Sequence, residues 1–353
     1  MDRIGVGVIG ASVGGWASVS HVPALRSSPD FELRAISTSR RASADAAARE
    51  FGVAAAFDDH RDLLAHPGVD VVVVAVKVAH HHELVVDALA AGKVVYSEWP
   101  LAVTAEEAED LVVRADAAGA RTVVGLQGRY APEVVRAREL VLGGHIGRVL
   151  GTAVVGSGMV WGPEATGATA YWLDRDGGAT PLTAAALHAV DVLAATLGEF
   201  TSLSANLVVG RDEVSVDGVA TPVTAPDQVA VIGTLAGGAA ASVFYRGGAS
   251  RGDNFRWEIN GTDGDLVLTA DRGNVQTADL TLWAGRGADA VVTPIEVPKT
   301  GPEGPARNVA ALYANLARDL RDGTRTVPDF RHALERHRLV AAVERSSDTG
   351  LRV

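Results

Sequence analysis

The chain has 353 residues, 47% of them hydrophobic, and a formal net charge of −11. This length and hydrophobic content allow two domains with full cores, and a negative charge without basic clusters argues against nucleic-acid and anionic-membrane partners. The lack of cysteine excludes disulfides, thiolate metal sites and a cysteine nucleophile, and it fits a reducing compartment. A small molecule is therefore the expected partner.

The amino-terminal residues enter a predicted strand directly, without the charged and apolar regions of a signal peptide. The most apolar run, residues 71–76, has only the length of a strand and is closed by Lys77, so no membrane span is expected. These features favour a cytoplasmic protein.

The first 125 residues alternate short apolar runs with longer amphipathic runs. This alternation predicts an α/β fold in which helices join the strands of a doubly wound parallel sheet. Ligands bind such sheets beyond the carboxyl ends of the strands. The expected strands are residues 4–9, 32–37, 69–76, 94–97 and 122–125, and the expected helices are residues 42–51, 81–91 and 105–118.

A glycine-rich turn, GASVGGW, occupies residues 10–16, directly after the first expected strand. It is a G-x-G-x-x-G pattern with serine at the second glycine. The first glycine suits the tight turn and the third suits close packing of helix on strand, while the backbone amides that follow can hold a pyrophosphate. An ordinary glycine turn is the alternative, but the position favours dinucleotide binding. The residues expected to contact the cofactor here are Gly10, Ser12, Gly14, Gly15 and Trp16.

The segment after the second expected strand bears on the choice between NAD and NADP. Thr38, Ser39 and Arg40 stand there, followed by Arg41, and no acidic residue appears before Asp45. A carboxylate would repel a 2′-phosphate, whereas hydroxyls and guanidinium groups can bind one. NADP is therefore the favoured cofactor, with NAD possible. The alternative is that the arginines are solvated residues at the start of a helix.

Beyond residue 148 the pattern changes to repeated strands separated by turns, and two helices follow after residue 305. We therefore expect a dinucleotide-binding domain over residues 1–127 and a substrate-binding and dimerisation domain over residues 128–353, whose last helices pack back on the seam. The expected strands are residues 149–155, 202–209, 228–235, 239–245, 255–260 and 265–269, and the helices are 308–321 and 331–346.

Several short motifs together resemble the Gfo/Idh/MocA family, the glucose-fructose oxidoreductase and inositol dehydrogenase group. The resemblance implies a Rossmann domain followed by an α/β domain with a large, open, mostly antiparallel sheet. It also implies oxidation or reduction of sugars, cyclitols and related carbonyls, and a homo-oligomer, a dimer or tetramer, formed through the outer face of that sheet. The motifs are GVIG at 7–10, GGW at 14–16, HVPAL at 21–25, the run from His82 to Lys93, EWPL at 98–101, and His188 with Asp191.

Other motifs resemble a subgroup of this family, that of the yeast galactose-pathway repressor, which binds dinucleotide and acts as a regulator. This subgroup has tryptophan where the enzymes have lysine, which gives a precedent for a non-catalytic sensor. The motifs are Val78-Ala79 with His81, SEW at 97–99, GLQGR at 125–129, AREL at 137–140 and GHIG at 144–147.

Trp99 replaces the lysine of the Glu-Lys-Pro motif, which in the family's enzymes serves as, or polarises, the acid/base beside the nicotinamide. An indole cannot titrate, so Trp99 is expected either to stack on the nicotinamide or a sugar face or to form a packed hydrophobic lid. The sequence has three lysines, and among them Lys77 alone follows a strand at its ligand-facing end. Lys77 is therefore a candidate acid/base, with a solvated strand-end lysine as the alternative.

His188 is the second candidate acid/base, in a predicted helix over residues 180–197. Asp191 lies three residues further on and shares its helical face. The resemblance implies that this histidine binds or deprotonates the reacting hydroxyl with support from the aspartate, although Ala184 replaces an aspartate that many of the enzymes carry. A structural His–Asp pair is the alternative.

The resemblance assigns roles to His82 and Glu98, and further candidates follow strands or lie in polar loops. His82, Glu98, Val76 and Gln127 are expected beside the cofactor, with Glu98 on the nicotinamide ribose. Three consecutive histidines, at residues 80–82, cannot converge on one ion, so no metal site is expected. Further expected substrate-binding residues are Arg129, Tyr130, Tyr171 and Trp172. The alternatives are a salt bridge across the domain interface for the first two and a plain loop anchor for the last two.

Three functions fit the sequence. The first is an NADP(H)-dependent oxidoreductase for a hydroxyl or carbonyl of a sugar-like or cyclic molecule. The second is a dinucleotide-binding sensor that reports to a protein partner. The third is an enzyme that recycles a bound nicotinamide for net isomerisation, elimination or hydrolysis.

Overall fold

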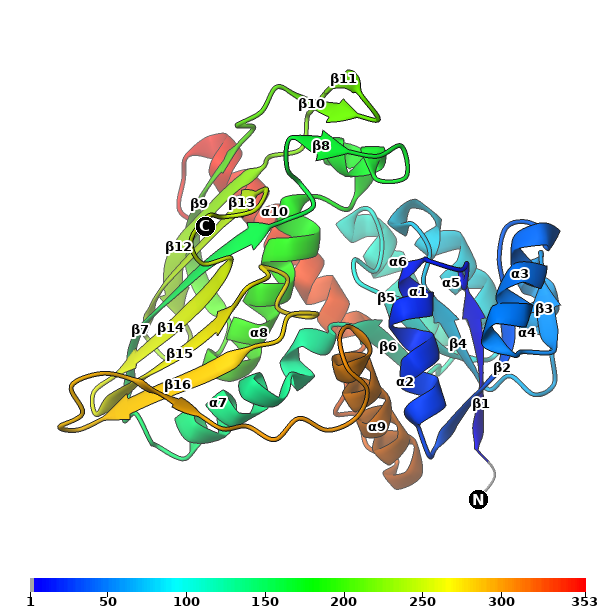
Figure 1. The fold of residues 1–353 in the computed structure, drawn as a ribbon, viewed down its shortest axis with the longest axis horizontal. Coiled ribbons are helices and arrows are strands. Elements are labelled where there is room, and N and C mark those ends of the chain that lie inside the picture. The colour runs from blue at the N-terminus through cyan, green and yellow to red at the C-terminus, as the bar shows by residue number, and fades with distance from the viewer. Residues whose placement is uncertain (1–2) are drawn as a thin grey trace. The chain divides into compact units, whose positions relative to one another are not determined.

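The computed structural model describes residues 3–353. Contacts divide the chain into two compact units, each with its own sheet and core (Figure 1). Unit 1 comprises the residues up to Gln127 together with Thr300–His337, and unit 2 comprises Gly128–Lys299 together with Arg338–Val353. The last helix, α10 (Phe330–Thr349), therefore begins in unit 1 and ends in unit 2.

Unit 1 is built on a sheet of six parallel strands in the order β3-β2-β1-β4-β5-β6. The strand order reverses between β1 and β4, and ligands of such sheets bind beyond the carboxyl ends of strands at this switch point. The four valines of β4 have no exposed surface, as expected for a central strand with both faces covered. The strands are β1 (Ile4–Ile9), β2 (Phe31–Ser37), β3 (Ala55–Phe57), β4 (Val71–Val74), β5 (Val94–Glu98) and β6 (Thr122–Gly125).

Two helices of unit 1 show how the sequence caps a helix end. The Thr104 hydroxyl accepts the Glu107 N–H at the start of α6, and Gly52 ends α3 in a left-handed conformation at φ 61°. The helices are α1 (Trp16–Val19), α2 (His21–Ser27), α3 (Arg41–Phe51), α4 (His60–Leu64), η1 (Val78–His80), α5 (His81–Ala90), α6 (Ala105–Ala117), α9 (Ala306–Asp322) and the first part of α10.

Unit 2 contains an eight-stranded sheet in the order β17-β16-β15-β14-β7-β13-β12-β9. Only the β7–β13 pair is parallel, and the other neighbours are antiparallel. The strands are β7 (Val149–Gly158), β9 (Phe200–Val208), β12 (Gln228–Leu235), β13 (Ala240–Gly247), β14 (Phe255–Gly261), β15 (Gly264–Ala270), β16 (Thr281–Arg286) and β17 (Thr293–Ile295), and a small second sheet joins β8 (Glu164–Ala165), β10 (Glu213–Val216) and β11 (Val219–Pro222).

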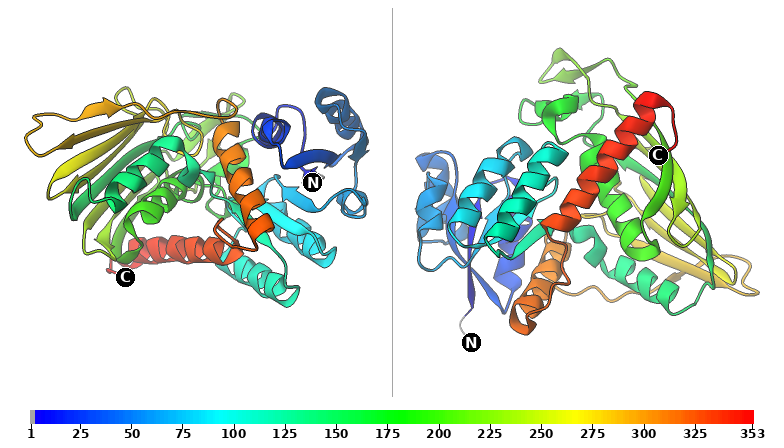
Figure 2. Two further views of the ribbon diagram at one scale, coloured as in Figure 1. Left: turned by 90° about the horizontal axis from the view of Figure 1, so that it is seen from below. Right: turned by 180° about the vertical axis from the view of Figure 1, so that it is seen from behind.

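The helices of unit 2 lie on one face of the large sheet, as Figures 1 and 2 show for α7 (Pro132–Leu142), α8 (Leu187–Leu197) and the end of α10. Almost every residue of α8 is buried, so this helix forms the centre of the core. Side chains on the other face of the sheet remain exposed, including Val155, Ile232 and Phe244.

The fold class predicted from the sequence is confirmed: a parallel Rossmann-type sheet and a large, mostly antiparallel sheet. Short elements were not predicted, because β3 and β17 have three residues each and α4 has five, too few for a period to emerge. The predicted helix over residues 180–197 begins as a π-helical segment, η5 (Pro181–Ala186), before α8. Within residues 3–353, no helix combines the length and the apolarity needed to cross a bilayer.

Candidate functional site

The glycine turn lies at the carboxyl end of β1. Gly10 has φ 94°, and a Cβ there would come within 2.4 Å of the Ala75 carbonyl oxygen, so only glycine allows this approach of the turn to the chain after β4. Gly14 also has a positive φ, 77°. Ser12 and Gly14 are exposed, Gly15 and Trp16 are half-buried, and α1 begins at Trp16. The turn therefore presents backbone and a hydroxyl to a ligand, and its glycines meet the requirements of a dinucleotide cradle.

The segment after β2 has one exposed guanidinium group, that of Arg40, with no bonding partner within residues 3–353. The Thr38 hydroxyl is buried and bonded to Ser43 Oγ at 2.7 Å, while Ser39 and Arg40 are exposed. Arg41 donates to Asp45 from Nε at 2.9 Å, which occupies both the guanidinium and the nearest carboxylate. Within residues 3–353, no hydrogen bond or ion pair holds the Arg40 side chain.

Glu98 ends β5 and is held by a buried histidine. His21 Nε2 lies 2.8 Å from Glu98 Oε1, and His21 Nδ1 lies 2.9 Å from the hydroxyl of Tyr313 on α9. His21 and Tyr313 are 0% exposed and Glu98 is 8% exposed. A Cβ on Gly125 at the end of β6 would come within 2.7 Å of Glu98 Oε2, so the carboxylate fills the space that this glycine leaves.

Trp99 follows Glu98 and packs inside unit 1. Its indole ring is 6% exposed and lies 4.8 Å, centroid to centroid, from the imidazole of His337 on α10. The Trp99–Pro100 peptide bond is cis. Burial lowers the pKa of His337 to about 4, so this imidazole is neutral at neutral pH.

The three consecutive histidines have separate surroundings. His81 is buried, with Nδ1 2.8 Å from the Pro100 carbonyl oxygen and Nε2 3.1 Å from that of Val76. It thus bridges the chain beyond β4 and β5, and burial lowers its pKa. His82, which the sequence placed beside the cofactor, directs Nε2 to Asp110 of α6 at 2.7 Å. No group of His, Asp or Glu side chains within residues 3–353 has a geometry that could hold a metal ion.

The remaining predicted residues of unit 1 also lie beyond the strand ends. Val76 is half-buried and Lys77 is exposed, in the segment that follows β4. Gln127, which follows β6, is 1% exposed, and its side-chain Oε1 is buried without a hydrogen-bond partner within the described chain. An unsatisfied buried carbonyl of this kind suits a ligand that donates a hydrogen bond.

In unit 2, a bidentate ion pair holds Asp191 of α8. Arg129 donates to it from Nε at 3.0 Å and from a terminal nitrogen at 2.6 Å. Burial alone would lower the pKa of Arg129, but the Asp191 carboxylate reverses this effect and raises it. His188 is buried one turn earlier on α8, and Tyr130 is half-buried beside Arg129 in the chain.

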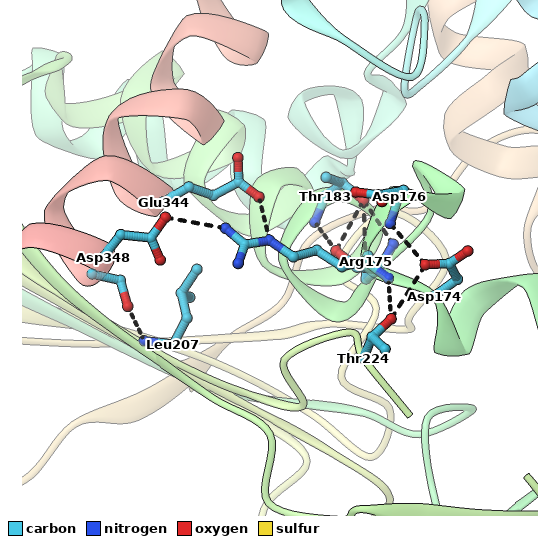
Figure 3. Close-up of polar contacts among 10 residues, drawn as sticks. Asp174, Arg175, Asp176, Thr183, Leu207, Thr224, Glu344 and Asp348 are labelled. Atoms are coloured by element: carbon cyan, nitrogen blue, oxygen red, sulfur yellow. Dashed lines mark hydrogen bonds and ion pairs between the residues drawn. The ribbon is translucent and has the colours of Figure 1, made fainter. Parts of the chain in front are cut away.

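An aromatic row lies in the segment before η5. The Trp172 ring is 5.3 Å from that of Trp161 and 5.7 Å from that of Tyr171. Burial raises the pKa of Tyr171, so its phenol stays protonated at neutral pH. This segment is fixed at Arg175, which lies between Glu344 and Asp348 of α10, while Thr224 accepts its backbone N–H at 2.9 Å (Figure 3).

Comparisons with known proteins match both parts of the chain. Residues 4–126 match the family model described as an oxidoreductase family with an NAD-binding Rossmann fold, GFO_IDH_MocA, and residues 132–270 match the model of the Gal80p C-terminal domain. The first match bears out the expected resemblance to the Gfo/Idh/MocA family over residues 4–126. Residues 4–126 are thus similar to the NAD-binding Rossmann folds of an oxidoreductase family.

The proteins similar to this chain include a regulator and a sugar dehydrogenase. The chain is 28% identical over 303 residues to the galactose/lactose metabolism regulatory protein GAL80 of Saccharomyces cerevisiae, covering 79% of this chain and 70% of that protein. It is 27% identical over 299 residues to the levoglucosan dehydrogenase of Pseudarthrobacter phenanthrenivorans, covering 77% and 75%. The crystal structure of a super-repressor mutant of Gal80p from S. cerevisiae matches with a TM-score of 0.91 and 26% identity, over 100% of this chain and 97% of that one.

Sequence reasoning assigned no role to several side chains that shape these sites. His21 lay in a recognised motif, but its partners Glu98 and Tyr313 are 77 and 292 residues away, so no local pattern connects them. His81 differs from His82 only by its position on α5, which decides that His81 faces the strand ends. Two further side chains without a predicted role are His337, in a charged stretch of α10, and Trp161, in a glycine-rich loop.

Proposed function

We propose that this chain is an NADP(H)-dependent oxidoreductase that acts on a hydroxyl or carbonyl group of a sugar-like or cyclic small molecule. The observation that carries the proposal is the Glu98 carboxylate, fixed by His21 at the carboxyl end of β5, in a unit whose glycine turn leaves backbone exposed beyond β1. A carboxylate in this position is an acceptor for sugar hydroxyls of a dinucleotide. A bound nicotinamide would supply the group that accepts or donates the hydride.

The preference for NADP rests on the end of β2. Arg40 is exposed, and its guanidinium can pair with a 2′-phosphate in a charge-assisted bond. The nearest carboxylate, Asp45, is held by Arg41, so it is not available to bind the hydroxyls of an NAD ribose. Ser39 is exposed beside Arg40 and can add a hydroxyl.

The proton that accompanies hydride transfer needs a titrating group other than residue 99. Trp99 has no titrating group, and its neighbour His337 is neutral in the physiological range. We assign the proton to His188 on α8, with Lys77 after β4 as the second candidate. The bidentate bond from Arg129 fixes the Asp191 carboxylate one turn from His188. In this proposal Arg129, Tyr130, Tyr171 and Trp172 bind the substrate.

The aromatic row supports a polyhydroxylated substrate. Sugar rings expose C–H faces that stack on aromatic rings, while their hydroxyls bond to neighbouring polar groups. Tyr171 and Trp172 are both half-buried, so each keeps part of its ring accessible. The similarity to a levoglucosan dehydrogenase supports the same class of substrate.

Trp99 and the match of residues 132–270 to the Gal80p C-terminal domain favour a second candidate, a dinucleotide-binding regulator. A regulator needs the cofactor site but not the acid/base, so it would bind dinucleotide and keep that affinity without His188 and Lys77.

A third candidate, an enzyme that recycles its nicotinamide, would retain the cofactor through purification and show no net change in absorbance during turnover.

One experiment separates these functions. The purified protein is incubated with NADP⁺ or NAD⁺ and a panel of aldoses, anhydro sugars and cyclitols, while the reduced-nicotinamide absorbance and the sugars are followed. An oxidoreductase gives substrate-dependent reduced nicotinamide, and a recycling enzyme converts a sugar without it. Dinucleotide binding without conversion of any sugar would favour the regulator and contradict the proposal.

We propose a homo-oligomer formed through the bare face of the unit 2 sheet, the face opposite α7 and α8. Val155 of β7 pairs with Phe244 of the neighbouring strand β13, and Ile232 lies on the adjacent strand β12. All three are exposed apolar residues on three neighbouring strands of the sheet. Exposed apolar groups gathered on one face are typical of a surface that another chain covers.

A further inference from the structure

The carboxylate of Glu98 is one end of a buried chain of three polar groups in unit 1. His21 opens α2, Tyr313 lies in α9, and Glu98 ends β5, so three separate elements meet at the imidazole. The imidazole is bonded at both nitrogens, to Glu98 Oε1 at 2.8 Å and to the Tyr313 hydroxyl at 2.9 Å. The Tyr96 ring lies edge-on to the imidazole at 5.1 Å and fixes the plane of the ring.

The hydrogens in this chain can be assigned from the chemistry of its groups. An ionised carboxylate only accepts, so Nε2 of His21 carries a proton and donates it to Glu98. In this tautomer Nδ1 is an acceptor, and the Tyr313 hydroxyl donates to it. Burial, together with the charge of Glu98, raises the pKa of Tyr313 well above its ordinary value, so the phenol keeps this proton.

These three hydrogen-bonded groups do not reach solvent at the Tyr313 end. Tyr313 and His21 have no exposed surface, and Glu98 retains only 8%. A proton that entered at Glu98 would therefore have no route to solvent through Tyr313. The arrangement suits holding a carboxylate in place rather than relaying protons.

We propose that His21, held in one tautomer by the Tyr313 hydroxyl, positions the Glu98 carboxylate to accept the hydroxyls of the nicotinamide ribose. This inference rests on the proposed function, which places a dinucleotide at Glu98. His21 and Tyr313 are positioning residues, because both act on the ligand only through Glu98. Fixing the carboxylate in advance removes the need to order it when the cofactor binds.

Two substitutions of His21 separate its two bonds. The amide of glutamine reaches the position of Nε2, so His21→Gln keeps a donor for Glu98. The shorter asparagine reaches the position of Nδ1, so His21→Asn keeps a partner for Tyr313 and loses the donor to Glu98. Tyr313→Phe removes only the hydroxyl and leaves the aromatic packing with Phe31 and Tyr96 in place.

The dissociation constants of NADPH and of the isolated adenosine half of NADP are measured by calorimetry for each variant, with melting temperatures as a fold control. We expect His21→Asn to weaken NADPH binding about tenfold, because a bond to a charged group is lost. His21→Gln should stay within about threefold of the wild type, and Tyr313→Phe should lie between them. The adenosine half, which lacks the nicotinamide ribose, should bind all variants equally.

The outcomes distinguish the two proposals. If the wild type binds no dinucleotide, the proposed function fails. If the wild type binds NADPH and His21→Asn binds it equally well, the role of His21 is overturned while the function stands. Equal weakening of NADPH by His21→Gln and His21→Asn, or parallel loss of the adenosine half, would also overturn it, because the effect would then be general damage to unit 1.

Discussion

The indole of Trp99 packs against the imidazole of His337, with ring centroids 4.8 Å apart and an interplanar angle of 48°. The two residues come from different elements, one after β5 and one in α10, and both are at least nine-tenths buried. Position 99 thus holds an indole in contact with an imidazole that is neutral at neutral pH. In the proposed reaction, proton transfer therefore depends on groups other than residue 99.

The buried His337 should make the protein less stable in acid. Its pKa is about 4 in the folded state against an ordinary value of 6.5, so the unfolded chain takes up the proton first as the pH falls. The resulting loss of stability begins near pH 6.5 and is complete below pH 4, with a limit of about 3 kcal/mol. Denaturant unfolding of the wild type and of His337→Phe at several pH values measures the difference. Parallel curves for the two proteins would contradict the prediction.

Removing one partner of the Arg129–Asp191 ion pair should lower the free energy of unfolding strongly. Asp191 is 1% exposed, and Asp191→Ala leaves a guanidinium in a largely buried position without its carboxylate. We expect a loss of about 3–5 kcal/mol in the free energy of unfolding. The double variant Arg129→Met, Asp191→Leu removes both charges and should recover most of this loss. If the single and double variants are equally unstable, packing rather than charge determines the effect.

The cofactor preference should follow Arg40 and not Arg41. Removing a guanidinium that binds the 2′-phosphate should weaken NADPH binding about tenfold in Arg40→Ala, with little change for NADH. Arg41 is already bonded to Asp45, so Arg41→Ala is the matched control and should change NADPH affinity less than about threefold. Calorimetric titration of both cofactors measures the four values. An equal loss for NADH would argue that Arg40 does not read the phosphate.

The bare sheet face of unit 2 should control the oligomeric state. Ile232 is 61% exposed and Phe244 is 40% exposed, so Ile232→Arg and Phe244→Arg should leave the melting temperature of the isolated chain nearly unchanged. Sedimentation should show the wild type as an oligomer and the double variant as a monomer. Val219, 66% exposed on β11, provides the control Val219→Arg, which should remain oligomeric. A monomeric wild type would contradict this proposal.

Local patterns made the Rossmann unit predictable. Each of β1, β4 and β6 is a short apolar run, and the glycine turn and Thr104 mark where a strand or loop gives way to a helix. The bounds of β1 and β6 match the predicted residues 4–9 and 122–125. β16 was not predicted, because its three consecutive apolar residues, Leu282 to Ala284, show no alternation of apolar and polar residues.

The site was less predictable because its contacts join distant residues. The i+3 spacing indicated a link between His188 and Asp191, but spacing alone could not show that Asp191 accepts from Arg129, 62 residues away. The neutral state of His337 depends on its burial, which the charged sequence around it conceals. Tertiary packing, not local sequence, determines both.

The most direct test of the proposed chemistry measures turnover and cofactor binding in two variants, His188→Asn and Lys77→Met. In the wild type, oxidation of the best sugar of the panel should reduce the nicotinamide cofactor. His188→Asn should lower kcat at least about a hundredfold, because it removes a general acid/base. Its dissociation constant for NADPH should stay within about twofold, since the cofactor-binding residues are intact. Full turnover in His188→Asn would contradict the account. So would a wild type that binds NADPH but, when supplied with NADP⁺, oxidises no member of the panel.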